Sequence, residues 1–165
     1  MKILEKLAKL CAILAGVLLT TITLMTCASI IGRETIGKTI TGDFELSGVA
    51  AGAAIALFMP WCQFSRGNIF VDFFTAKASE NTQLNMERLG ALLLGIVMAV
   101  MTWRTVLGGL NAFNTNSGTM MLGFPEYVVY AAMVPPLALT ALISLHQAVF
   151  GFSKAETESN PELAV

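Results

Sequence analysis

Four long apolar runs separated by polar connections dominate the chain. They cover about residues 8–32, 44–64, 84–106 and 126–152. Each has about 20 residues or more, the length that crosses roughly 30 Å of hydrocarbon as a helix. Apolar residues follow one another without the alternation of a strand. The pattern predicts an all-α integral membrane protein, a single membrane domain over 1–165 with four transmembrane helices.

An amphipathic segment separates the second run from the third. Over 69–78, apolar residues recur at the i, i+3, i+4 spacing of one helix face, and they are Ile69, Phe70, Phe73 and Phe74. Asp72 and Lys77 fall on other sides of the same helix. The spacing predicts a short helix in the membrane interface, with its rings at the acyl boundary and its charges among the headgroups.

The other connections and the end of the chain are polar. Residues 107–124 contain a Gly-Gly pair and three asparagines, which predict a turn-rich connection. Pro135 and Pro136 interrupt the last run and predict a kink or a loss of backbone hydrogen bonds there. Residues 153–165 are acidic and carry no apolar period, so we expect a disordered tail.

Small residues recur at every fourth position on three of the runs. In the second run this row is Gly48, Gly52 and Ala56. Such a row lets another helix approach closely, and in lipid this close packing replaces the hydrophobic drive. Two interpretations stay open, packing within this chain and docking to another membrane protein. Because three runs carry such rows, a tilted layer of helices against a partner is favoured over a compact bundle.

Composition and charge agree with the membrane interpretation. The chain is 55% hydrophobic and 13% charged, and its net charge of −1 argues against a nucleic-acid partner. Seven of the ten Lys and Arg residues lie in the N-terminal segment, the middle connection and the tail: Lys2, Lys6, Lys9, Arg66, Lys77, Arg88 and Lys154. By the positive-inside bias, both termini and the middle connection are predicted to be cytoplasmic.

The residues that an enzyme or redox carrier needs are scattered. Cys11, Cys27 and Cys62 form no C-x-x-C pair, and His146 is the single histidine. We therefore expect no enzyme activity, no cofactor and no metal site. The central parts of the first three runs contain no charged residue, whereas a carrier that works alone usually has ionisable groups near the midplane. An accessory membrane subunit is favoured, and the alternative is a small homo-oligomeric transporter or channel.

Short motifs on both sides of the second run resemble those of a known family. GDFELSG, with Asp43 and Glu45, begins the run, and SRGNIFVDFF, with Arg66, Gly67 and Asp72, follows it. Their order and spacing are similar to those of the small, DctQ-type membrane subunit of tripartite ATP-independent periplasmic (TRAP) transporters.

Further matches extend this resemblance over about residues 8–152. Arg33 stands at the end of the first helix, Pro125 introduces the last one, and Pro135 follows ten residues on. One position departs from the family pattern, because Asn68 stands where a histidine is common. If that histidine contributes to contact with the partner, the contact is altered here.

The resemblance implies a non-catalytic small subunit of the bacterial inner membrane, with both termini in the cytoplasm. In this family a large membrane subunit holds the sodium and substrate sites. A periplasmic binding protein delivers an organic anion, such as a carboxylate or a sialic acid, and a sodium gradient drives uptake. The resemblance thus implies three partners, the large subunit, the binding protein and the lipid bilayer, and a scaffolding role for this chain.

Within that picture the motif residues suggest specific contacts. An ion pair between Arg33 and Glu45 is one hypothesis for how the first two helices meet, and separate headgroup-facing charges are the alternative. A pair between Arg66 and Asp72 is a second hypothesis, for the cytoplasmic turn, with lipid anchoring as its alternative. The connection 107–124 is the candidate contact for the binding protein.

Overall fold

The computed structural model describes residues 2–65 and 80–150. Four helices in these ranges are long and apolar enough to cross a membrane, which confirms the predicted all-α fold with four such helices. They are α1 (Lys2–Ile36), α2 (Asp43–Phe64), α4 (Glu80–Thr115) and α5 (Glu126–Phe150). The interfacial helix predicted over 69–78 and the tail predicted over 153–165 lie outside the described residues. So do Arg66, Gly67 and Asp72.

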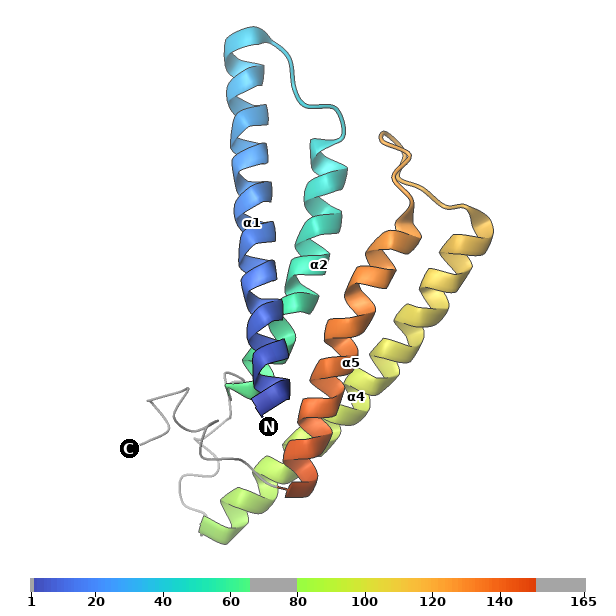
Figure 1. Ribbon diagram of the computed structural model, residues 1–165. Coiled ribbons are helices and arrows are strands. Elements are labelled where there is room, and N and C mark those ends of the chain that lie inside the picture. The colour runs from blue at the N-terminus through green and yellow to red at the C-terminus, as the bar shows by residue number, and fades with distance from the viewer. Residues whose placement is uncertain (1, 66–79, 151–165) are drawn as a thin grey trace.

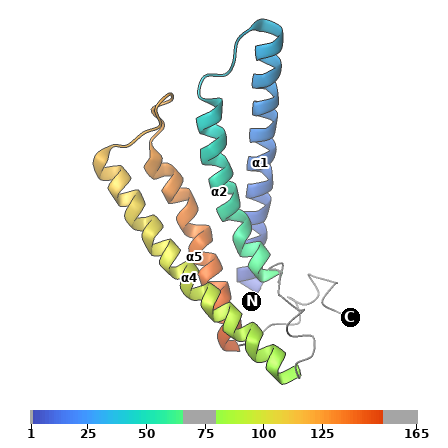
Figure 2. The same ribbon diagram turned by 180° about the vertical axis from the view of Figure 1, so that it is seen from behind.

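The helices form two hairpins that together make a V (Figure 1). Helix α1 packs on α2, α2 packs on α5, and α5 packs on α4, while α1 and α5 touch only slightly. The hairpins meet at the terminal end, where α1 begins and α5 ends, and diverge toward the loop end, where the connections 37–42 and 116–125 lie (Figure 2). The neighbour order is therefore that of a layer, in agreement with the arrangement favoured from the small-residue rows.

Helix α4 is longer than its sequence predicted, and its glycines explain why. A Cβ placed on Gly109 would stand 2.9 Å from Cβ of Tyr130, and one on Gly108 would stand 3.2 Å from the Tyr130 ring. The Gly-Gly pair is therefore a packing surface for α5, as small residues commonly are between membrane helices. The turn-rich connection predicted over 107–124 begins instead after Thr115, so the first half of that prediction was wrong.

The packed core is thin and lies mainly at the terminal end of the V. Ala8, Phe64 and Ile143 form one buried cluster that joins α1, α2 and α5, and Trp61 stacks on Phe64 with their ring centroids 5.9 Å apart. Most other buried apolar residues are alanines. Large apolar side chains are instead widely exposed on the outer helices, as lipid or a membrane partner requires.

The two prolines do not end α5, which runs without a break from Glu126 to Phe150. Neither proline has an N–H to donate to the preceding turn, so the predicted loss of backbone hydrogen bonds is inherent in the sequence. One turn further on, the Thr140 hydroxyl donates to the carbonyl of Pro136 over 2.8 Å.

Candidate functional site at the loop end

A buried serine ties the start of α2 to α1. The hydroxyl of Ser29, a residue that is 2% exposed, donates to Oδ2 of Asp43 over 2.5 Å. The hydroxyl oxygen of Ser29 accepts the backbone N–H of Ile40 over 3.3 Å, and Asp43 Oδ1 accepts that of Phe44 over 2.7 Å. Ser29 therefore holds the end of the connection 37–42, and Asp43, which the motif singled out, joins this serine to the first turn of α2.

The carboxylate of Glu45 links the two hairpins. Its Oε1 accepts the backbone N–H of Met121 over 2.9 Å, and its Oε2 accepts that of Leu122 over 3.3 Å. Beside it, Gly42 has a left-handed φ of 77° and contacts the side chain of Leu122. We call this contact the loop latch: Gly42 and Glu45 on one hairpin, Met121 and Leu122 on the other.

The connection 116–125 has a defined shape of its own. The N–H of Thr119 donates to the carbonyl of Phe124 over 3.0 Å, and the N–H of Gly123 donates to the carbonyl of Thr119 over 2.9 Å. An isolated antiparallel β-bridge pairs Gly118 with Pro125, the proline that the sequence predicted at the start of the last helix. These bonds present the tip residue Met120 with 99% of its surface exposed.

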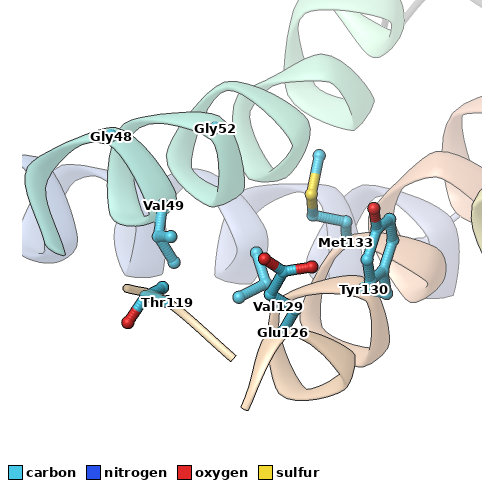
Figure 3. A pocket seen from close by; sticks show the side chains of 8 residues that line it. All are labelled: Gly48, Val49, Gly52, Thr119, Glu126, Val129, Tyr130 and Met133. Carbon is cyan, nitrogen blue, oxygen red and sulfur yellow. The ribbon is translucent and has the colours of Figure 1, made fainter. Parts of the chain in front are cut away.

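A cavity of about 420 Å³ lies beneath the latch, between α2 and α5. Its lining is shown in Figure 3 and consists of Gly48, Val49, Gly52, Thr119, Glu126, Val129, Tyr130 and Met133. No atom of a neighbouring element stands within 4 Å of a Cβ placed on Gly48 or Gly52. These two predicted contact residues therefore open a space instead of packing closely on a helix of this chain.

The opposite end of the V is joined by two buried glutamines that the sequence did not single out. Nε2 of Gln63 donates to Oε1 of Gln147 over 2.6 Å, and Nε2 of Gln147 donates to the backbone carbonyl of Gln63 over 3.2 Å. Gln63 is 5% exposed and Gln147 is fully buried. This reciprocal pair fixes α2 against α5 near the point where the hairpins meet.

The remaining predicted residues are exposed. Nε of Arg33 lies 3.7 Å from Oε1 of its neighbour Glu34, with both side chains more than half exposed. The hypothesised ion pair between Arg33 and Glu45 is not formed, because Glu45 faces the loop latch instead. Pro135 is exposed on α5.

The polar contacts at the two ends of the V hold the helices relative to one another. Within residues 2–65 and 80–150, no three His, Cys, Asp or Glu side chains stand close enough to hold a metal ion. The loop end supplies two carboxylates, Glu45 and Glu126, an apolar tip and a cavity. Such groups suit contact with a partner or with lipid.

Removing the Glu45 carboxylate should free the loop tip. In Glu45→Ala we expect the amides of Met121 and Leu122 to exchange with deuterium about tenfold faster, because both lose their acceptor. Glu45→Gln keeps one acceptor oxygen and should show an intermediate effect. Hydrogen exchange read by mass spectrometry measures this directly. Glu34→Gln, a carboxylate change away from the latch, is the control, and equal exchange in all four proteins would contradict the role given to Glu45.

Comparison with known families gives one match. The model of the family described as "Tripartite ATP-independent periplasmic transporters, DctQ component" matches residues 22–153, which is most of the chain and includes α2, α4 and the loop latch. No curated protein matches the chain. No solved structure matches it either.

Proposed function

The chain belongs to the DctQ component family of the tripartite ATP-independent periplasmic transporters, and from this premise we propose that it scaffolds the large membrane subunit during sodium-driven uptake of an organic anion. One observation carries the proposal. Only 6% of the most apolar stretch of α1 and 11% of that of α4 is buried within the chain. The two outer helices of the layer thus present long apolar faces on which another membrane protein can pack.

The interior of the chain supports an accessory role. Its buried polar groups are used in holding the helices. Gln63 and Gln147 bond to each other, and the hydroxyls of Thr140 and Ser144 donate to carbonyls one turn back on α5. Carriers usually place ionisable groups near the midplane, and the middle stretches of the spans carry none. We assign the sodium and substrate sites to the large subunit, and neither a cofactor nor catalysis to this chain.

Orientation follows from the charges at the terminal end. Lys6 and Lys9 lie in the first turns of α1, so by the positive-inside bias we place the terminal end in the cytoplasm of the bacterial cell and the loop end in the periplasm. The exposed tip of the connection 116–125 then faces the side from which a periplasmic binding protein arrives. We propose Met120 and its neighbours as part of that contact.

Affinity purification and reconstitution test the proposal together. From detergent-solubilised native membranes, we expect the tagged chain to bring down a large polytopic protein in stoichiometric amount. Proteoliposomes containing this chain alone should take up no organic anion, whereas those with the large subunit and its binding protein should do so only with a sodium gradient. Recovery of a homo-oligomer that transports unaided would overturn the proposal and establish the alternative.

A further inference from the structure

The cavity between α2 and α5 changes in polarity with depth. Its loop-end rim carries the carboxylate of Glu126 and the hydroxyl of Thr119. Deeper along α5 come Val129 and then Met133, and the facing wall on α2 is the open glycine surface described above. Figure 3 shows the Glu126 carboxylate projecting from the first turn of α5 toward α2. The cavity is therefore acidic at its outer end and mainly apolar below, where Tyr130 with its hydroxyl is also part of the lining.

The position of Glu126 corresponds to the headgroup level of a bilayer. The ring of Tyr127, the next residue, meets that of Phe113 edge to face with centroids 5.4 Å apart, so the first turn of α5 lies level with the last turns of α4. These last turns carry the exposed Asn111 and Asn114, and lie beyond Arg104, a charge of the kind that reaches for the interface. Val129 and Met133, the apolar part of the cavity, lie about one and two turns further along α5, toward the acyl chains.

The apolar part of the cavity is large enough for a hydrocarbon occupant. An apolar cavity of roughly 150 Å³ already takes up benzene, and this one measures about 420 Å³. Because the helices form a layer, the surrounding bilayer reaches the space between α2 and α5 directly. An acyl chain can lie along Gly48 and Gly52, beside Val49, the α2 side chain in the lining.

The carboxylate of Glu126 at the rim favours a cationic partner. Among the described residues, no ion pair or side-chain hydrogen bond engages Glu126. We propose that the cavity binds one phospholipid with a primary-ammonium headgroup, of the ethanolamine type, whose N–H groups donate to Glu126 while one acyl chain fills the space down to Met133. A basic side chain of a protein partner would satisfy the carboxylate but leave the apolar depth unfilled, and a choline headgroup has no N–H to donate.

The lipid retained by the full-length chain tests this site. The chain is purified into nanodiscs containing equal amounts of phosphatidylethanolamine and phosphatidylcholine, released gently, and its bound lipid identified by native mass spectrometry. The wild-type chain should retain one lipid, with about a fivefold preference for phosphatidylethanolamine, the strength of an ion pair at an interface. Glu126→Gln should retain as much lipid but without the preference.

Two further variants separate the headgroup from the acyl chain. Gly52→Leu fills the cavity, where there is room for a side chain, and should lose lipid of both kinds. Glu34→Gln, outside the cavity, is the matched control and should behave as the wild type. Absence of retained lipid, or an unchanged preference in Glu126→Gln, would overturn the proposal. The proposal would also be overturned if a polypeptide co-purified in stoichiometric amount with the wild-type chain but not with Glu126→Gln, while the lipid ratio stayed unchanged. The carboxylate would then belong to a protein contact.

Discussion

Replacing Gly42 with alanine is expected to lower the free energy of unfolding by about 2 kcal/mol. The backbone there has a φ of 77°, which an L residue adopts only with strain. An added Cβ would also stand 2.4 Å from Cγ of Leu122, too close for any real contact. Leu122 must then move, and its N–H moves away from Glu45. Thermal or denaturant unfolding in detergent measures the loss.

A second glycine in the same connection separates strain from collision. Gly37 has a similar φ of 70°, but nothing stands within 4 Å of a Cβ placed on it. Gly37→Ala should therefore lose only about 1 kcal/mol. Adding Leu122→Ala to Gly42→Ala should relieve the collision and bring the loss down toward that of Gly37→Ala. Equal losses in Gly42→Ala and Gly37→Ala would show that Leu122 does not press on Gly42 in solution.

The four spans were predictable because each is a long run of apolar residues. In a bilayer a single segment of this kind can satisfy its backbone hydrogen bonds within itself by forming a helix. The second span begins within one residue of its predicted position, since Asp43 follows a glycine and opens the helix. The length of α4 was not predictable in the same way. Gly108 and Gly109 break helices in water, but here Tyr130 of another helix packs on them.

The candidate site was predictable in its residues more than in its contacts. The acidic start of α2 identified Asp43 and Glu45, yet their partners, Ser29 and the amides of Met121 and Leu122, follow only from the tertiary arrangement. A backbone amide leaves no signal in the sequence. The hypothesis that Glu45 pairs with Arg33 assumed a partner of opposite charge across the short connection. The actual partners of the Glu45 carboxylate are two backbone N–H groups that lie 76 and 77 residues away in the sequence.

The glutamine pair shows the same limit at the other end of the V. Gln63 and Gln147 stand near the ends of two apolar runs, where polar residues are common and usually face headgroups. Because Gln63 and Gln147 are 84 residues apart, the sequence does not indicate that they bond to each other. With the loop latch, this pair makes two polar connections between the hairpins, one buried and one exposed, while the space between them is open at the cavity.

Removing the buried connection should therefore cost more than removing an exposed hydroxyl. In Gln147→Leu, Nε2 of Gln63 loses the acceptor oxygen of Gln147 and the carbonyl of Gln63 loses the N–H donor of Gln147, both in a buried place. We expect the free energy of unfolding to fall by about 1–2 kcal/mol, the upper part of the range for polar contacts between membrane helices. Thr23→Val, which removes an exposed hydroxyl bonded only within its own helix, is the control and should change little.

A double-mutant cycle then isolates the pair itself. If the two amides depend on each other, Gln63→Leu with Gln147→Leu should cost clearly less than the sum of the single changes, because neither leaves a polar partner of the other buried alone. Additive losses would mean that each glutamine is held by other groups and that the pair does not join the hairpins. A coupled pair predicts in addition that spin labels at the loop ends of α2 and α5 show a broader distance distribution in Gln147→Leu than in the wild type, because the buried connection between these two helices is lost.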